Sequence, residues 1–420
     1  MRTPRPNDPS LRRRYSPSAA IEKTVRSILA EVRSGGDEAL VRLTKKFGGP
    51  KLKPGELRVT PGELALAGKA AGAQTRRAVK EARANVLAFA KRGLRKDWRG
   101  RNRHGVEVGE RFDPFLRVGI YVPGGTAPLV STAIMTVALA VAAGVPEIVV
   151  ATPANASGAI NPDLLYALAQ AGATEIIKAG GAQAIAALAY GTAAVKPVLK
   201  IFGPGNAYVV EAKRQVFGAV AVDLLPGPSE ILVIADETGN PDWIAADLLA
   251  QAEHGKGSSV GLLTTSPELL SAVKEKLAAQ RRGLNRVEHL AEGLENAFVI
   301  LVKEMDEAVE IANEFAPEHL AIVARDEEAL ARRIRTAGAI FLGGMSPVVG
   351  GDFIAGPSHE LPTGGAGKSF SGLTVDQFQR RTSIVRFDRK SLAASLPAIE
   401  AFSEIEGLDA HGRSAAIRLQ

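Results

Sequence analysis

The sequence predicts an α/β fold with two Rossmann-like parallel-sheet domains, a small N-terminal extension and a helical C-terminal tail. Short apolar runs alternate with amphipathic segments from Val118 onward, and a second series of the same kind begins at Glu230. Repeated strand–helix alternation produces a mostly parallel sheet with helices on both faces. A chain of 420 residues is also long for a single hydrophobic core and favours two or more domains.

The first series follows a charged N-terminal region whose periodicity predicts helices at 21–47 and 62–92. Apolar runs such as "VGIYV" and "EIVVAT" have the length of buried strands, and the amphipathic segments between such runs have the length of helices. The predicted strands of this series are 118–122, 147–152, 175–180 and 198–202. Its predicted helices are 131–144, 161–171, 182–190 and 205–216.

The second series repeats the pattern from "EILVIAD" to "AIFLG". Its predicted strands are 230–236, 260–265, 297–302, 319–324 and 339–343. Its predicted helices are 241–254, 267–281, 305–315 and 326–337. The two series have no low-complexity linker between them, so we expect the two sheets to be closely packed. The tail after Val375 is predicted to be mainly helical.

The composition narrows the possible classes of protein. The chain has no cysteine, which excludes disulfides, thiolate metal sites and a cysteine nucleophile, and which fits a reducing compartment. The first twenty residues are basic but lack the apolar core of a signal peptide. The most apolar stretch, 134–150, is broken by Gly144 and Pro146 and is typical of a buried core rather than a membrane span. We therefore expect a cytoplasmic protein without a membrane partner.

The net charge of +7 raises the possibility of a nucleic-acid partner. Basic residues cluster at Arg12–Arg14 and in "KRGLRKDWRGRNRH" at 91–104, but neither cluster has interleaved aromatic residues or a known binding motif. A solvated basic face that helps to attract anionic ligands is the better interpretation. We expect no nucleic-acid partner.

Glycine-rich loops follow three predicted strands, at 123–125, 180–184 and 203–208. Glycine lets the backbone approach a ligand closely, and a helix start offers free N–H groups to a phosphate. The G-x-G-x-x-G fingerprint is absent from the sequence, so a standard dinucleotide site is not indicated. Ligands of open parallel sheets bind beyond the carboxyl ends of strands. Three such loops together favour a ligand crevice over isolated structural turns.

Scattered polar residues suggest a metal site built from nitrogen and oxygen ligands. Gln251 and His254 are three residues apart on a predicted helix and share one face. Asp352 and His359 lie in a glycine-rich loop, and Glu406 and His411 lie near the C-terminus. Without cysteine, a zinc-like site would use such side chains. The spacing alone also fits exposed, hydrogen-bonded residues, which is how we interpret His104 and His289.

The stretch "PEHL" places Glu318 directly before His319 at the start of a predicted strand. Neighbours on a regular strand point to opposite faces. The local sequence leaves open whether these side chains reach one reacting centre from an irregular strand entrance or are ordinary surface residues. Pro317 favours an irregular entrance.

Eight motifs together resemble the histidinol dehydrogenase family. The match is collinear from about the first predicted helix to the C-terminus. Its motifs are "GIYVPGGTAPLVSTAIM", "GGAQAIAALAYGT", "KIFGPGNAYVVEAKRQVFG", "LPGPSEILVIAD", "LLAQAEHG", "FAPEHL", "GDFIAGPSHELPTGG" and "EGLDAHG". The resemblance implies a zinc-dependent, NAD-linked homodimer with one Zn²⁺ per subunit. It also implies the oxidation of L-histidinol through L-histidinaldehyde to L-histidine, the last steps of histidine biosynthesis, with two NAD molecules.

The resemblance also implies roles for individual residues. Glu318 and His319 would transfer protons, and zinc would be held by Gln251, His254, Asp352 and His411. Substrate would contact Ser229, His359 and Glu406 as well as His319 and the four metal ligands. Tyr121, Gln183 and Asn206 would line the NAD site, in agreement with the glycine loops. The family exchanges its terminal segments in the dimer, so Glu406 and His411 would complete the partner's site.

The chemistry gives these roles a physical reason. An alcohol gives up hydride only as its O–H proton leaves, so a base must lie within hydrogen-bond reach. His319 suits that role because histidine titrates near neutrality. The second oxidation needs a water activated by a carboxylate, which suits Glu318. The metal would act mainly as a template that binds the amino group and imidazole of histidinol.

With this resemblance we expect four parts in the chain. They are an N-terminal extension (1–22), a first α/β domain with most metal and catalytic residues (23–118 and 231–375), an NAD-binding α/β domain (119–230) and an exchanged helical segment (376–420). The stretches "HGKGSS" and "GGAGKSFSGL" depart from the family pattern and bear on substrate preference. The alternatives are a related zinc/NAD dehydrogenase for another small polar alcohol, a zinc hydrolase in which Glu318 activates water, and a non-catalytic binding protein.

Overall fold

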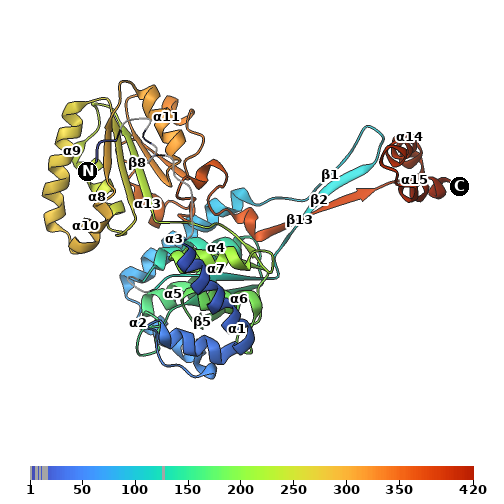
Figure 1. The fold of residues 1–420 in the computed structure, drawn as a ribbon, viewed down its shortest axis with the longest axis horizontal. Coiled ribbons are helices and arrows are strands. Elements are labelled where there is room, and N and C mark those ends of the chain that lie inside the picture. Colours follow the sequence, from blue (N-terminus) through green and yellow to red (C-terminus); the bar gives the residue numbers. More distant parts are fainter. Residues whose placement is uncertain (1, 5–7, 9–10, 12–17, 125–127) are drawn as a thin grey trace.

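The computed structural model describes residues 2–4, 8, 11, 18–124 and 128–420, and it has two α/β units and a projecting arm (Figure 1). Within these residues, each unit contains a five-stranded parallel sheet, and the arm carries a three-stranded antiparallel sheet that ends in two helices. The predicted pair of Rossmann-like parallel sheets is confirmed. No helix among the described residues is long and apolar enough to cross a membrane.

The sheet of the first unit has the strand order β5–β4–β3–β6–β7. Its strands are β3 (Arg117–Tyr121), β4 (Glu147–Thr152), β5 (Glu175–Lys178), β6 (Lys200–Phe202) and β7 (Ala221–Val222). Its helices are α4 (Val130–Ala142), α5 (Pro162–Ala171), α6 (Gly181–Tyr190) and α7 (Ala207–Val216). The central strands are buried along nearly their whole length because helices cover both faces, which explains their continuous apolar runs.

Three N-terminal helices complete this unit: α1 (Ala19–Lys46), α2 (Pro61–Ala70) and α3 (Ala73–Gly93). Helix α1 packs on α6 and α7, α2 on α5, and α3 on α4. The apolar stripe of α1, which includes Val25, Ile28 and Val32, joins the same core as the apolar residues of α6. The domain boundaries expected from the sequence placed residues 23–118 in one domain with 231–375. In the structure, these helix contacts join residues 19–93 to the unit formed by 119–230.

The two predicted N-terminal helices are interrupted. Gly36 has a non-helical backbone (φ 54°) inside α1, where two helical segments meet at a kink. The predicted helix 62–92 is two helices, because the chain turns at Ala71–Gly72. Thr60 caps α2 by accepting a hydrogen bond from the N–H of Glu63, and Pro61 occupies the first helical position.

The sheet of the second unit has the order β10–β9–β8–β11–β12. Its strands are β8 (Glu230–Ala235), β9 (Ser259–Thr264), β10 (Phe298–Leu301), β11 (His319–Val323) and β12 (Ala339–Leu342). Its helices are α8 (Pro241–Ala252), α9 (Pro267–Gln280), α10 (Val287–Leu294), α11 (Met305–Phe315), α12 (Glu327–Ala331) and α13 (Val348–Phe353). Ile231 and Val233 pack into the core on one face of the sheet, and Leu232 packs into the core on the other.

The predicted helix 326–337 is wrong beyond Ala331. After α12 the chain continues in turns, with Arg333 N–H bonded to the carbonyl of Leu330 at 3.0 Å. The side chain of Asn313 on α11 binds this backbone: it donates a hydrogen bond to the carbonyl of Arg333 and accepts one from the N–H of Arg335. A tertiary contact therefore replaces the local helical bonds.

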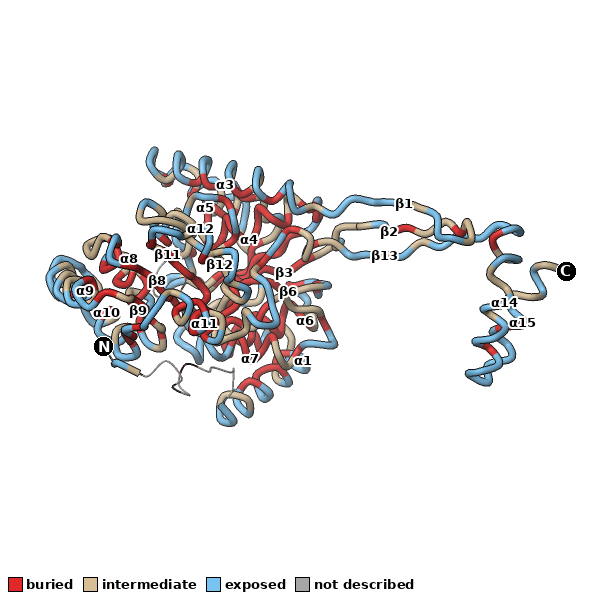
Figure 2. Tube along the Cα trace, turned by 90° about the horizontal axis from the view of Figure 1, so that it is seen from above, coloured by how far each residue is buried: buried red, intermediate tan, exposed pale blue. Residues whose placement is uncertain are grey.

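The arm consists of β1 (Trp98–Arg101), β2 (Glu107–Pro114), β13 (Gln379–Arg386), α14 (Arg389–Glu406) and α15 (Asp409–Ala416). Strand β13 pairs antiparallel with β2 along its whole length. The expectation of a mainly helical tail is therefore wrong for its first part. The arm is mostly exposed in Figure 2, so β13 lacks the in–out alternation by which a half-buried strand is recognised. Short 3₁₀ turns lie at Pro54–Glu56, Arg281–Gly283, Ala366–Lys368, Val375–Phe378 and Ile417–Leu419.

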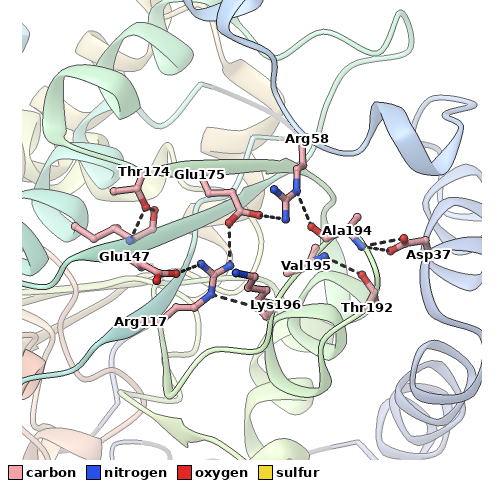
Figure 3. Close-up of polar contacts among 11 residues, drawn as sticks. Asp37, Arg58, Arg117, Glu147, Thr174, Glu175, Thr192, Ala194, Val195 and Lys196 are labelled. Carbon is pink, nitrogen blue, oxygen red and sulfur yellow. Dashed lines mark hydrogen bonds and ion pairs between the residues drawn. The ribbon is translucent and has the colours of Figure 1, made fainter.

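An ionic network closes the amino edge of the first sheet (Figure 3). Arg117 at the start of β3 pairs with Glu147 and with Glu175, and the Arg117–Glu175 contact is 2.9 Å. Arg58, which follows the Pro54–Glu56 turn, also pairs with Glu175 at 3.1 Å. These charges fasten the N-terminal region to the amino ends of the strands. The opposite, carboxyl edge faces the second unit.

Candidate active site

A first cavity of about 550 Å³ lies between the two units. It contains seven of the residues predicted for metal, substrate or proton transfer: Ser229, Gln251, His254, Glu318, His319, Asp352 and His359. The predicted cofactor residue Asn206 also lines it, together with Pro204 and Gly205 of the same loop. The structure therefore gathers residues that are more than a hundred positions apart in the sequence.

The first cavity lies at the carboxyl edge of the first sheet and at the amino edge of the second. In the first unit its walls come from loops after strands, such as the loop from β6 to Asn206, as expected. In the second unit Ser229, Ser258 and Glu318 directly precede β8, β9 and β11. The expectation that ligand-binding loops follow strands is thus wrong for the second sheet, because its amino edge faces the first unit.

The stretch Pro317–Leu320 enters β11 irregularly. Ala316, which ends α11, has a left-handed backbone (φ 50°), and among the described residues it is the only one other than glycine with a positive φ. Glu318 lies just outside the strand and His319 begins it, so the alternation of a regular strand does not separate them. Both side chains are buried, and both line the first cavity.

Hydrogen bonds fix both side chains. Glu318 Oε2 accepts from Ser229 Oγ at 2.5 Å and from the N–H of Glu230 at 2.8 Å. His319 Nδ1 donates to the carbonyl of Glu230 at 2.9 Å, and its Nε2 lies 3.2 Å from Asp352 Oδ1. The start of β8 therefore orients the carboxylate and the imidazole together.

The charges around His319 favour its protonated form. Burial opposes a charge on the imidazole, but the carboxylates of Glu318 and Asp352 outweigh burial and hold the pKa of His319 well above its ordinary value. Burial also opposes the charge on Asp352, which for a carboxyl group means a higher pKa. The hydrogen bond of Asp352 with His319 outweighs burial and lowers the pKa of Asp352. Asp352 is therefore a carboxylate near neutral pH.

Three of the four predicted metal ligands line the first cavity. Gln251 lies in the last turn of α8, His254 follows that helix, and Asp352 lies on α13. Gln251 Nε2 is buried without a hydrogen-bond partner among the described residues. Loss of solvation lowers the pKa of His254, which favours the neutral imidazole that metals bind. Amide oxygen, imidazole and carboxylate are ligand types that fit Zn²⁺, and this set supplies three of the usual four protein ligands of a structural site.

His411, the fourth predicted ligand, lies elsewhere. His411 on α15 and Glu406 at the end of α14 are exposed at the tip of the arm, away from the cavity (Figure 1). Neither lines the first or the second cavity. Accordingly, no group of three or more His, Cys, Asp or Glu side chains in the described part of the chain is arranged to hold a metal ion.

His359 connects the two units across the cavity. Its Nδ1 donates to the carbonyl of Asp352 at 3.0 Å, and its Nε2 lies 3.0 Å from Thr132 Oγ1 of α4. Its Nε2 also lies 3.5 Å from a carboxylate oxygen of the buried Glu360. Burial lowers the pKa of His359, but Glu360 outweighs this and raises it.

A second cavity of about 620 Å³ adjoins the carboxyl edge of the first sheet. All three predicted NAD residues line it: Tyr121, Gln183 and Asn206. The hydroxyl of Tyr121 accepts a hydrogen bond from the N–H of Gly181 at 3.0 Å. The cavity lies where strand order reverses between β3 and β6, the position at which such sheets bind nucleotides. Of the "PGG" loop, Pro123 and Gly124 line this cavity, and Gly125 is outside the described residues.

Sequence reasoning missed several residues of the two cavities. Thr24, Ile28, Thr44 and Phe47 of the α1 region line the second cavity, and Thr132, Asp247, Lys256, Arg286 and Glu360 line the first. The position of Asp247 had a usable signal, because it lies one turn before Gln251 on the same helix face. The others depend on contacts between distant segments.

Known proteins of one family match nearly the whole chain. The histidinol dehydrogenase family model matches residues 11–419. Histidinol dehydrogenase of Rhodopseudomonas palustris is 47% identical over 404 residues, which cover 96% of this chain and 93% of the relative. That of Geobacillus kaustophilus is 45% identical over 399 residues, covering 95% and 94%. A crystal structure of histidinol dehydrogenase from Elizabethkingia anophelis superposes with a TM-score of 0.94 at 35% identity, covering 97% of this chain and 94% of that one. The chain therefore belongs to the histidinol dehydrogenase family.

Proposed function

We propose that this protein oxidises L-histidinol through L-histidinaldehyde to L-histidine in two NAD-linked steps. The observation that carries the proposal is that Asn206 lines both cavities. A dinucleotide in the second cavity would therefore end beside a substrate in the first, next to Glu318 and His319. NAD bound there would accept hydride from the substrate carbon.

The zinc site of the proposal consists of Gln251, His254 and Asp352 from one chain and His411 from another. Zinc held there would bind the amino group and imidazole of histidinol and so orient the substrate. The neutral imidazole of His254 and the ionised carboxylate of Asp352 support this assignment, since these are the forms in which the two side chains bind zinc. Ligation by Asp352 would also weaken its hold on the proton of His319.

In the alcohol step, His319 would take the hydroxyl proton as hydride leaves the carbon. Its Nδ1–H bond to the carbonyl of Glu230 fixes the tautomer, so Nε2 is the nitrogen that would accept the proton. Once Asp352 is engaged in ligation, the pKa of His319 would fall toward the range of a base.

In the aldehyde step, Glu318 would activate the water that hydrates the carbonyl carbon. Both hydrogen bonds that orient this carboxylate go to Oε2. Oε1 is thus the oxygen that would receive the water proton.

We also propose that the arm completes the site of a partner subunit in a homodimer. Glu406 and His411 are exposed on the arm, together with the large apolar residues Phe402 and Ile405. An exposed apolar surface of this kind is typical of a subunit interface. His411 would supply the missing zinc ligand and Glu406 a substrate contact. A cytoplasmic location stays a prediction.

The test is NADH formation from L-histidinol with purified protein, with and without a chelator. We expect NADH only in the presence of metal, and zinc should restore the chelated enzyme. His254→Ala should lower the bound zinc, since it removes one of four protein ligands. Full activity of metal-free protein would refute the zinc assignment, and NADH from another small polar alcohol at a higher rate would identify a related dehydrogenase instead.

A further inference from the structure

A buried ion pair holds the backbone of the loop that separates the two cavities. Lys213 lies on α7 and Asp223 directly follows β7, and their side chains are 0% and 2% exposed. Lys213 Nζ contacts Asp223 Oδ1 and also donates a hydrogen bond to the carbonyl of Gly203 at 2.8 Å. The N–H of Gly203 donates to Asp223 Oδ2 at 2.8 Å. The pair thus binds both polar backbone groups of one residue.

Gly203 directly follows β6, and neighbouring backbone leaves no room for a side chain there. Its φ is +103°, and a Cβ atom there would lie 2.2 Å from the carbonyl oxygen of Tyr121. A side chain is therefore excluded, and the backbone lies against the end of β3. Small shifts of Gly203 would move the loop relative to Tyr121, which lines the second cavity.

The same loop is fixed at its other end by Asn206. Asn206 Oδ1 accepts hydrogen bonds from the N–H groups of Tyr208 at 3.0 Å and Val209 at 3.2 Å, and so caps α7. Lys213 lies farther along that helix and returns to Gly203. Hydrogen bonds and the ion pair thus connect the loop, its helix and the end of β7. Pro204, Gly205 and Asn206 of the loop line the first cavity, and Asn206 also lines the second.

Stability alone does not explain this pair. Removing two charges from water has a large free-energy cost, and apolar residues of similar volume often stabilise a core as well or better. What apolar residues cannot do is bind a carbonyl and an N–H at once. We propose that Lys213 and Asp223 are positioning residues that hold the Gly203–Asn206 loop in the geometry that binds the dinucleotide. This inference rests on the proposed NAD-linked function.

The test combines Lys213→Met and Asp223→Asn in one variant, with single variants beside it. The double variant leaves neither charge of the pair without its partner, and the amide introduced at position 223 can still accept from the N–H of Gly203. We expect its melting temperature to stay within a few degrees of the wild type. We expect Kd for NAD, measured by calorimetry without substrate, to rise at least about tenfold, and KM for NAD to rise with it. KM for histidinol should change less than about threefold.

A matched control removes a comparable ion pair at the opposite edge of the same sheet. Arg117 and Glu175 are 12% and 16% exposed and lie at the amino ends of β3 and β5, away from the cavities. Arg117→Met with Glu175→Gln should lower the melting temperature yet leave Kd for NAD within twofold of the wild type.

The outcomes separate this inference from the proposed function. If the wild type neither binds NAD nor forms NADH from histidinol, the proposed function is wrong and this inference falls with it. If the wild type does both and the double variant matches its Kd and KM within twofold, only the positioning role is wrong. Asp223→Asn alone is a second candidate for a folded variant, because the amide has nearly the shape of the carboxylate. If neither that variant nor the double variant folds while the control does, the pair maintains the fold and the inference is refuted.

Discussion

Replacing Glu318 by glutamine isolates its role as a base. Both observed hydrogen bonds to its carboxylate, from Ser229 Oγ and the N–H of Glu230, go to the same oxygen. The amide of glutamine can place its carbonyl oxygen there and keep both bonds, now without charge. Weakening two charge-assisted bonds costs about 1–3 kcal/mol of folding stability. The shape of the site should therefore survive.

The amide cannot accept a proton at neutral pH, so the aldehyde-to-acid step loses its base. A general base contributes roughly 10²–10⁴-fold, which corresponds to about 3–5 kcal/mol of barrier. The alcohol step should slow less than about tenfold, because His319 remains. The two steps are assayed separately by supplying histidinol or histidinaldehyde and following NADH, at a temperature where circular dichroism shows the variant folded. Equal slowing of both steps would refute the division of roles between Glu318 and His319.

Three further predictions follow from the arm, the second cavity and α8. Mixing His319→Ala with His411→Ala subunits should restore part of the activity through heterodimers with one intact site; subunits that demonstrably exchange without recovery would mean that each chain builds its own site. Phe47 is 50% exposed and Thr44 Oγ1 has no partner among the described residues, and both residues line the second cavity. Thr44→Val and Phe47→Ala should each raise KM for NAD about three- to thirtyfold with kcat nearly unchanged. An unaffected KM would exclude this wall from the NAD site. Burial raises the pKa of Asp247 to about 6 despite a hydrogen bond from the N–H of Val348; because the folded pKa lies above the unfolded one, this group's contribution to stability falls as pH rises from about 4 to 6. In urea titrations Asp247→Asn should abolish about 1–2 kcal/mol of that fall, after allowance for solvent screening, and an identical pH profile of both proteins would contradict the assignment.

Much of this fold is predictable because the strands of both parallel sheets are buried on both faces. Runs such as Ile231–Ala235 are continuously apolar for that reason, and their alternation with helices sets the topology. The arm gave no comparable signal. Strand β13 is largely exposed and pairs with β2, more than 250 residues away, so neither apolar periodicity nor a nearby turn marks it.

The candidate site was predictable where its residues are close in sequence or belong to long motifs. Glu318 and His319 are adjacent, and Gln251 and His254 share a helix end, so local spacing marked them as candidates. Their roles were assigned only by the resemblance of the long motifs to one family. The edge of the second sheet that bears the site was not predictable, since the common rule for parallel sheets indicates the carboxyl edge. Thr44 and Lys213 had no local signal either, because their roles depend on what packs against them.

The stoichiometry of the reaction most directly tests the proposed two-step oxidation of L-histidinol. Purified protein with zinc and excess NAD should convert a limiting amount of L-histidinol to L-histidine with two NADH formed for each histidinol consumed. Both products can be counted in one sample, NADH by absorbance and histidine by chromatography. One NADH per histidinol with histidinaldehyde released, or no NADH at all, would contradict the account.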